Sequence, residues 1–530
     1  MSSIALMSVS TLICKILGLI FKWPMLKYVG IQGMAYFSAS YHIYLLLDTL
    51  ATAGLPIALS MLVSASRALG KRANVRRIFR ISMTAFVILG ALGTIFLYFR
   101  SDSIAGWIGM PDAAPSVRAI APTLFFVCVS SAIRGYFQGH EFMAPTAYSQ
   151  LIESFGKLFL GVLLASSSMK SGADPSVTAA AALKGLSTGV GIAVLYLLIS
   201  LAIFPKTKRY RTFPDVDPGK ESIGKICSDL IRIALPITLS ASITSITALA
   251  DTALITKRLI SSGMSAELAS GTYSSYSNLG LPLYNLAPAL IAPLAITLVP
   301  VLTASIVSGD SERERSVFYA SFRVCIFFAL PASAGLSVFS EPILKLIFPG
   351  ETEAIGLCAS LLSVLSVSVV FTCLTTVTNA ILQTYRKQVL PIVSMAIGAA
   401  AKIISEYFLL VTPVGAYAAP LSTFICTVTV VTLNICFIGK YSPFRFRMNI
   451  VWRSLGATVV AISGAIGVFF VFGLIGLSER ISLIPAILSA IILYLVFAFR
   501  FEALTEEDLK LIPKGDKVIL YLRKAKLMKR

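Results

Sequence analysis

Long apolar stretches recur along the whole chain and decide what it can fold into. A helix needs about 20 mostly apolar residues to cross a bilayer. About fourteen stretches meet that need, centred near residues 15, 52, 89, 126, 155, 191, 241, 289, 327, 368, 399, 427, 463 and 489. A mean hydropathy of +0.84 excludes an ordinary soluble enzyme. The sequence therefore predicts an all-α polytopic membrane protein with about 14 transmembrane helices.

The first apolar stretch contains three lysines, Lys15, Lys22 and Lys27. A cation at the bilayer centre costs roughly 2.5–3.5 kcal/mol on insertion scales, so it should face a cavity or a partner rather than lipid. We interpret Lys15 and Lys22 as part of a positive interior that suits an anionic substrate. Lys27 lies near the outer end, where its side chain can reach the membrane surface.

Basic residues gather in alternate loops. The basic clusters are Arg67–Arg80, Lys206–Arg211, Arg313–Arg315, Arg386–Lys387, Lys440–Arg453 and Arg523–Arg530. This positive-inside pattern predicts a multi-pass protein of the cell membrane with both termini in the cytoplasm. It also explains the formal net charge of +20, so we expect no nucleic-acid partner.

The residue types needed for catalysis or metal binding are not grouped in this chain. Its eight cysteines include no C-x-x-C pair, and it has only two histidines, so we expect no metal site and no cofactor. Gly185–Gly189 matches G-x-S-x-G, but no histidine follows Ser187 to complete a hydrolase triad. Small residues in a packed membrane helix explain the motif better. We expect a protein without catalytic residues rather than an enzyme.

A weak internal duplication indicates two related halves. Phe137-Gln138-Gly139 ends the fourth span of one half, and Leu382-Gln383-Thr384 occupies the same place in the other. Two halves of like order are typical of transporters built from parallel repeats. The predicted divisions are a six-helix half at 1–204, a cytoplasmic linker at 205–225, a second six-helix half at 226–438, two additional transmembrane helices at 452–500 and a basic cytoplasmic tail at 501–530.

The fifth span of each half carries an acid and a base spaced i, i+4. These are Glu153 with Lys157, and Lys402 with Glu406. Residues at that spacing share one helix face, so we favour mutual neutralisation, although Lys157 and Lys402 can also face a cavity. Arg134, at the cytoplasmic end of the fourth span, is expected to act in a structural gate or to contact an entering phosphate.

Asp48 and Asp251 are acids inside the second and seventh spans. Two interpretations remain open for them. A carboxylate in a low-dielectric cavity can exchange a proton or bind Na⁺ and so couple transport to an ion gradient. It can equally be a charge partner for Lys15 or Lys22, with Lys257 as a further partner for Asp251.

Several motifs together resemble a known family. They are Lys15-Ile-Leu-Gly18 with Lys22-Trp-Pro24, Ala53-Gly-Leu-Pro56, Arg134-Gly-Tyr-Phe-Gln-Gly139 and Ala250-Asp251-Thr252. The chain is similar along its length to the stage V sporulation protein B and MurJ-like lipid-linked oligosaccharide flippases, the polysaccharide biosynthesis proteins of the MOP superfamily. The resemblance implies a V of two six-helix bundles plus two C-terminal helices. It also places Lys15 and Lys22 where MurJ-like members carry cavity arginines. Lysine keeps the positive charge but lacks the planar guanidinium group that binds phosphate through two parallel hydrogen bonds.

The resemblance implies a flippase that moves an undecaprenyl-diphosphate-linked sugar from the inner to the outer leaflet by alternating access, with the peptidoglycan precursor lipid II as first candidate. The expected partners are that lipid-linked oligosaccharide and membrane lipids, with cell-wall synthesis proteins as a further candidate. A cation-coupled MATE-type drug exporter is the alternative, but a cationic first span would repel drug cations. A scaffold of a wall-synthesis complex is a third hypothesis. Roles in growth and in sporulation both remain open.

Overall fold

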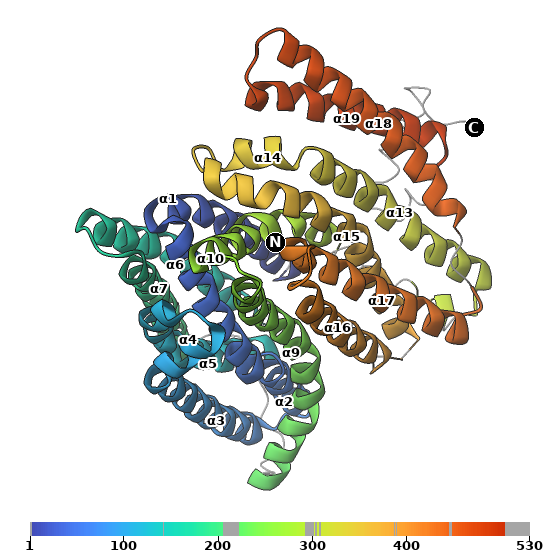
Figure 1. The fold of residues 1–530 in the computed structure, drawn as a ribbon. Coiled ribbons are helices and arrows are strands. Elements are labelled where there is room, and N and C mark those ends of the chain that lie inside the picture. Colours follow the sequence, from blue (N-terminus) through green and yellow to red (C-terminus); the bar gives the residue numbers. More distant parts are fainter. Residues whose placement is uncertain are drawn as a thin grey trace. The chain divides into compact units, whose positions relative to one another are not determined.

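The structure is a computed structural model that describes residues 3–140, 142–204, 222–291, 302, 305–306, 309–385, 387, 389–444 and 448–503. Every regular element within these ranges is a helix, as predicted (Figure 1). The chain divides into two compact units: unit 1 is Met1–Ile260 with Met264–Ser274, and unit 2 is Ser261–Gly263 with Ser275–Arg530. The linker expected at 205–225 and the tail expected at 501–530 lie almost entirely outside the described residues.

Unit 1 contains the first helices of the chain. They are α1 (Ser3–Thr52), α2 (Leu55–Ala68), α3 (Arg72–Phe99), α4 (Ser101–Ile108), the 3-10 turn η1 (Pro111–Ala113), α5 (Ala114–Gly139), α6 (Ala144–Lys170), α7 (Pro175–Ile203), most of α9 (Ile223–Ser261) and most of α10 (Ala266–Ser275).

Unit 2 contains the π-helical turn η3 (Tyr276–Gly280), α11 (Leu281–Tyr284), α13 (Ser311–Val338), α14 (Ser340–Ile347), α15 (Thr352–Thr384), α16 (Val389–Leu409), the 3-10 turn η4 (Gly415–Tyr417), α17 (Ala418–Tyr441), α18 (Asn449–Leu474) and α19 (Glu479–Arg500).

Within the described ranges, 11 helices are long and apolar enough to cross a membrane, or up to 12 if the bent pair Ile223–Leu239 and Ala241–Ser261 is one span. One of them, Ile16–Arg67, combines most of α1 with α2. It has 52 residues and would be about 78 Å long if straight. That is more than twice the about 30 Å of a hydrocarbon core, so it accounts for the first two expected spans. The span expected near residue 289 lies partly outside the described residues, which end at 291 in this region. The chain is thus a multi-pass membrane protein, and the total of fourteen spans stays a prediction.

A glycine divides α1 into two segments. Gly30 has φ 74° and ψ 172°, a backbone conformation that is essentially restricted to glycine. No atom lies within 4 Å of the place where a Cβ would be, so the backbone angle rather than crowding requires glycine here. Lys22 lies on the segment before the break, and Asp48 lies on the segment after it.

A buried core in unit 1 joins α2, α3, α5, α7 and α9. Phe137 and Leu197 are fully buried in it, and Ile226, Leu230 and Ala234 of α9 belong to the same cluster. The helix that was expected to begin the second half therefore packs within unit 1. The expected halves, 1–204 and 226–438, were defined by the sequence repeat, whereas units 1 and 2 are defined by compactness. The division into these halves stays a prediction.

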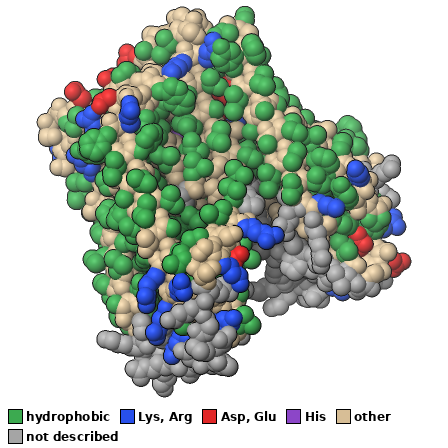
Figure 2. Space-filling view, turned by 90° about the horizontal axis from the view of Figure 1, so that it is seen from below, with side chains coloured by type: hydrophobic (Ala, Val, Ile, Leu, Met, Phe, Trp, Pro, Cys, Tyr) green, Lys and Arg blue, Asp and Glu red, His purple; other side chains and the backbone are tan. Residues whose placement is uncertain are grey.

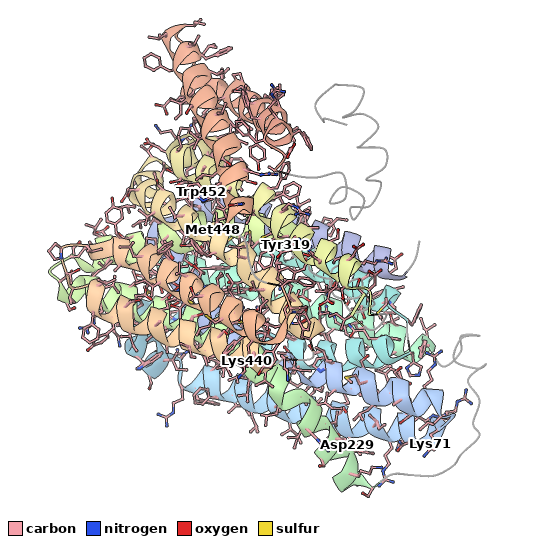
Figure 3. All side chains as sticks on the ribbon, turned by 90° about the vertical axis from the view of Figure 1, so that its right-hand side faces the viewer. Lys71, Asp229, Tyr319, Lys440, Met448 and Trp452 are labelled. Atoms are coloured by element: carbon pink, nitrogen blue, oxygen red, sulfur yellow. The ribbon has the colours of Figure 1, made fainter. Side chains whose placement is uncertain are left out.

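One end of unit 1 carries the basic turn between α2 and α3. Figure 3 shows Lys71 of this turn and Asp229 of α9 at that same end. The face drawn in Figure 2 is largely hydrophobic, and Lys and Arg side chains gather in its lower part. Apolar sides with basic ends are what a bilayer requires of a bundle whose basic loops remain in water.

In unit 2, α18 and α19 form a hairpin that packs on α13 and α14 (Figure 1). Ala457 and Ala498 are fully buried in this contact. Tyr494 of α19 donates a hydrogen bond to the carbonyl oxygen of Phe327 at 2.6 Å. These two helices correspond to the additional pair expected at 452–500.

The same local order occurs in both units. A 28-residue helix, α3 or α13, is followed directly by an eight-residue helix, α4 or α14, and then by a long helix, α5 or α15. Helix α5 ends at Gly139 and α15 at Thr384, where the duplicated tripeptides end. The matching order supports the internal duplication.

Small residues bring α6 and α7 together. Gly156 of α6 faces Gly189 of α7, and a Cβ built on Gly189 would lie 2.6 Å from the carbonyl carbon of Gly156. The Gly185–Gly189 motif thus lies inside a packed helix rather than on a strand-to-helix turn, in agreement with the small-residue explanation.

We predict that Gly189→Ala destabilises the protein by about 1–3 kcal/mol, because the added methyl meets backbone that cannot move aside cheaply. Gly467→Ala on α18 is the matched control, since no atom lies within 4 Å of its Cβ position. Thermal unfolding in detergent measures both variants. Equal melting temperatures for the two would contradict this account of the α6–α7 contact.

Candidate functional site

The first-span lysines differ in what the structure describes. The side chain of Lys15 lies outside the described residues. Lys22 is half-buried on the first segment of α1. Lys27 is exposed, with its ammonium group 6.0 Å from the centre of the Tyr28 ring. Of the two first-span lysines whose side chains are described, Lys22 is therefore the more buried.

A carboxylate on α6 holds two cations. Glu153 Oε2 accepts a hydrogen bond from Arg134 Nη2 of α5 at 2.8 Å, and its Oε1 accepts one from Lys157 Nζ at 2.6 Å. Arg134 Nε also donates to Ser149 Oγ at 2.9 Å. The three charged side chains are only 14–25% exposed. The i, i+4 pair is thus present, and Arg134 extends it to a third group from another helix.

Asp48 adds a second carboxylate to this group. It lies on the second segment of α1 and interacts electrostatically with Lys157, Glu153 and Arg134. Thr52 Oγ1 donates to Asp48 Oδ1 at 3.3 Å. Two acids and two bases therefore meet where α1, α5 and α6 pack together. We call Asp48, Arg134, Glu153 and Lys157 the unit 1 charge cluster; its formal charges cancel.

Asp251 belongs to a different part of unit 1. It is buried on α9, with 6% of its surface exposed, directly before Thr252. Lys257 was suggested as its partner. The Lys257 side chain packs against Gly109, and its ammonium lies 5.8 Å from the centre of the Trp107 ring, so it contacts the loop and helix after α3.

Sequence reasoning missed a hydrogen-bonded group that includes Thr252, the residue after Asp251. His42 Nδ1 of α1 lies 2.9 Å from Thr252 Oγ1 of α9 and 3.1 Å from the Tyr273 hydroxyl of α10. The two hydroxyl oxygens are 2.9 Å apart. Since Thr252 already donates to the carbonyl of Ala248, it can only accept within the group. The available signal was a histidine inside an apolar span, which is rare without a function.

Unit 2 carries the equivalent acid and base deeper in the protein. Lys402 is 8% exposed and Glu406 is fully buried, one turn apart on α16. Tyr284 of α11 interacts electrostatically with Lys402, and its hydroxyl forms a hydrogen bond with Thr372 of α15. The two fifth spans thus share charged residues at the same spacing, but unit 2 encloses them more completely.

A second polar group ties together the helix ends of unit 2. The Tyr385 hydroxyl donates to Glu314 Oε1 at 2.6 Å and lies 3.0 Å from Ser442 Oγ. Burial and the neighbouring carboxylate raise the pKa of Tyr385 above its ordinary value, so this hydroxyl stays a donor. The group joins the ends of α13, α15 and α17. The sequence did not single out these residues.

No group of three or more potential metal ligands occurs among the residues that the structure describes. Ion pairs and hydroxyl groups inside the helical units are instead the polar features.

Two family models match the chain. The model described as "Polysaccharide biosynthesis protein" covers residues 1–305, and the model described as "MatE" covers residues 236–408. The ranges overlap on α9 and α10 and together reach through α16.

Three proteins of Bacillus subtilis are similar in sequence. "Lipid II flippase MurJ" is 26% identical over 75% of this chain and 75% of its own length. "Stage V sporulation protein B" is 22% identical over 96% of both chains. "Uncharacterized membrane protein YabM" is 25% identical over 97% of this chain and 94% of its own.

Solved structures show the same fold. A lipid II flippase MurJ in an inward closed conformation has a TM-score of 0.70 at 17% identity, covering 94% of this chain and 99% of its own. An inward-facing multidrug resistance MATE transporter of the MOP superfamily has a TM-score of 0.66 at 17% identity, covering 83% of this chain and 99% of its own. The chain therefore shares the helical fold of MurJ and MATE transporters, as the resemblance implies.

We predict that Glu153→Gln destabilises the protein by about 3 kcal/mol, the lower end for a buried ion pair, because it leaves two shielded cations without their shared acid. Glu341→Gln is the matched control, because Glu341 is exposed; it pairs with Lys345, which also contacts Glu479. Such surface pairs contribute about 0–1 kcal/mol. Thermal unfolding in detergent measures the variants, and Glu153→Gln with Lys157→Gln should recover part of the loss. Equal effects of the single variants would show that the cluster contributes no more than a surface pair.

Proposed function

This chain belongs to the polysaccharide biosynthesis protein family of MOP-superfamily transporters, and from that membership we propose that it is a flippase for a lipid-linked oligosaccharide. Lipid II is the substrate we put first. The named relatives are flippase and transporter family members, which fits a protein that moves a molecule and does not transform it. We place it in the cell membrane with both termini in the cytoplasm.

The observation that carries the proposal is shielded positive charge inside an apolar bundle. A diphosphate headgroup is a dense anion, and its passage through hydrocarbon needs cations that are already held in the protein. Lys22 is half-buried in the first span, and the charges of the unit 1 cluster cancel one another. We propose that Lys15 and Lys22 bind the diphosphate directly, because both are cations within the apolar first span. Their ammonium groups act as point charges and do not form the paired hydrogen bonds that an arginine guanidinium makes with phosphate.

The unit 1 charge cluster has a different proposed role. Arg134 and Lys157 share the carboxylate of Glu153, and Asp48 interacts with all three. Rearranging such a group breaks several charge-assisted hydrogen bonds together, so it can hold a conformation until an incoming anion competes for its cations. We propose that Arg134 acts as a gate: its contacts with Glu153 and Ser149 hold α5 against α6 in one conformation. The buried Lys402–Glu406 pair would balance charge in the corresponding helix of unit 2.

Ion coupling is a proposal for the acids. Asp251 is buried, and the next residue on α9, Thr252, forms a hydrogen-bonded group with Tyr273 and His42. Oxygen ligands and a carboxylate are what Na⁺ or a proton would use. Asp48 lies among cations instead, so we favour the charge-partner role for Asp48 and the coupling role for Asp251.

A cation-coupled drug exporter is the second candidate. The "MatE" model matches residues 236–408, and a MATE transporter shares the fold over 83% of this chain. The helix pair α18 and α19 and the first-span lysines favour the flippase. A drug exporter would move organic cations, which Lys22 repels.

We predict that this protein rescues bacteria depleted of their own lipid II flippase, and that Lys22→Ala abolishes the rescue. The measurement is the amount of lipid II that a membrane-impermeant hydrolase can reach from outside. Lys22→Arg should retain activity, because the positive charge remains. Lys27→Ala is the matched control, since Lys27 is exposed on the same helix.

Activity retained in Lys22→Ala would overturn the cationic site but not the flippase. Absence of rescue by a well-inserted, stable protein would exclude lipid II. Export of an organic cation under the same conditions would then favour the MATE-type function.

The proposed orientation gives a separate prediction. A fluorescent protein that folds only in the cytoplasm should fluoresce when fused after Arg530, and alkaline phosphatase at the same position should be inactive. A fusion in the loop between α6 and α7, after Gly172, should show the reverse. Active phosphatase at the C-terminus would contradict the assigned topology.

A further inference from the structure

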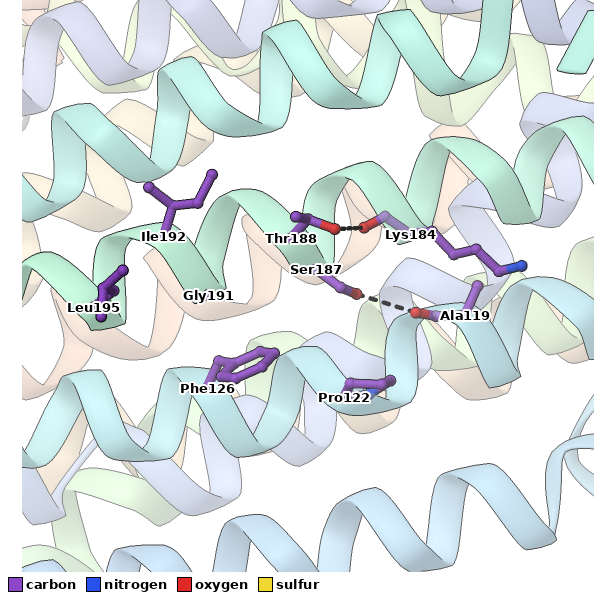
Figure 4. A pocket seen from close by; sticks show the side chains of 9 residues that line it. All are labelled: Ala119, Pro122, Phe126, Lys184, Ser187, Thr188, Gly191, Ile192 and Leu195. Atoms are coloured by element: carbon purple, nitrogen blue, oxygen red, sulfur yellow. Dashed lines mark hydrogen bonds between the residues drawn. The ribbon is translucent and has the colours of Figure 1, made fainter. Parts of the chain in front are cut away.

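Unit 1 has a groove on its side, outside the charge cluster. It lies between α5 and α7 and has a volume of about 600 Å³, within the roughly 300–1,000 Å³ typical of ligand sites (Figure 4). Its lining residues are Ala119, Pro122, Phe126, Lys184, Ser187, Thr188, Gly191, Ile192 and Leu195. Pro122, Ile192 and Leu195 are exposed, so the groove opens at the surface that faces the bilayer.

Local residue types explain the groove. Gly191 has no side chain to fill the space, and its Cβ position is 3.6 Å from the Phe126 ring across the groove. Ser187 Oγ donates to the carbonyl oxygen of Ala119 at 3.0 Å, and Thr188 Oγ1 donates to that of Lys184 at 2.8 Å (Figure 4). The hydroxyl groups are thus satisfied within the protein. What remains for a ligand is an apolar surface with one cation.

That cation lies at one end of the groove. Lys184 is exposed, and its side chain extends past Ala119 in Figure 4. Side chains on a helix lean toward its N-terminus, so the ammonium group is directed toward the start of α7. Nine residues separate Lys184 from Pro175, about 14 Å along the axis. From Lys184 to the end of α7 at Ile203 the helix rises about 28 Å, close to the thickness of one hydrocarbon core, so the ammonium group of Lys184 can lie at the headgroup level.

The length of the groove matches one leaflet. From Lys184 to Leu195 the helix rises about 16 Å. Half of a hydrocarbon core is about 15 Å. An acyl chain whose headgroup phosphate meets Lys184 would therefore run along Gly191 and Ile192 and end near Leu195, close to the bilayer midplane.

We propose that this groove binds an anionic phospholipid of the leaflet at the start of α7, with its phosphate at Lys184 and one acyl chain between α5 and α7. Charge complementarity and the match to one leaflet both favour this occupant. The site does not depend on the transported substrate, because it lies on the lipid-facing side of the two helices.

Native mass spectrometry of the full-length protein, titrated with phosphatidylglycerol or phosphatidylcholine, tests the proposal. The natural protein should prefer phosphatidylglycerol. Lys184→Ala should weaken phosphatidylglycerol binding about fivefold, the effect of removing one basic contact at a membrane surface, and remove the preference. Lys170→Ala is the matched control: Lys170 is exposed at the end of α6, on the same side of the membrane and outside the groove.

A second variant tests the apolar part. Gly191→Leu should reduce binding of both lipids because its side chain fills the groove, whereas Gly191→Ala places its Cβ at an ordinary contact distance from Phe126 and should bind as before. Unchanged phosphatidylglycerol binding in Lys184→Ala and Gly191→Leu would overturn the site. Displacement of the phospholipid by undecaprenyl phosphate, with the same loss in Lys184→Ala, would show that the occupant is a polyprenyl lipid instead.

Discussion

The cost of placing charge in hydrocarbon is the constraint on which this structure depends. A helix bundle in a membrane can retain ionised side chains only where another helix supplies the opposite charge or a polar cavity. Unit 1 meets this condition through Glu153, which receives Arg134 from α5 and Lys157 from its own helix. Because the pairing needs α5 and α6 in register, the same contacts that make the charges tolerable also fix the helices around them. A polar group thereby contributes positional specificity that apolar packing alone does not supply.

Transport adds a second requirement, since the protein must have more than one stable arrangement. Charge-assisted hydrogen bonds suit this need, because they are strong in one geometry and can be replaced by bonds to an incoming anion. Lys22 lies outside the neutral cluster, on the other segment of α1. In the proposed mechanism, this separation gives one set of residues that holds a conformation and another that binds the substrate. The groove at Lys184 adds a third use of a lysine, at the surface that contacts lipid.

Some of these features could be predicted from the sequence, and others could not. The contact of Glu153 with Lys157 follows from i, i+4 spacing, which depends only on helix geometry. Arg134 joins them from 19 residues away, through the packing of two helices that spacing does not describe. Tertiary packing also produces the electrostatic interaction of Asp48 with Lys157 and the hydrogen bond between His42 and Thr252. The membrane fold was predictable because hydropathy acts residue by residue, whereas the placement of α9 in unit 1 depends on which faces fit together.

The break at Gly30 has a mechanical consequence. The α1 segments on either side of it are helical, and no atom of another part of the protein lies within 4 Å of the place where a Cβ on Gly30 would be. The segment before Gly30 also packs against neighbouring helices, as Phe21 does against Gly161 of α6. Glycine can change its backbone angles with a smaller steric penalty than other residues, so the segment that bears Lys22 can change direction when its packing changes.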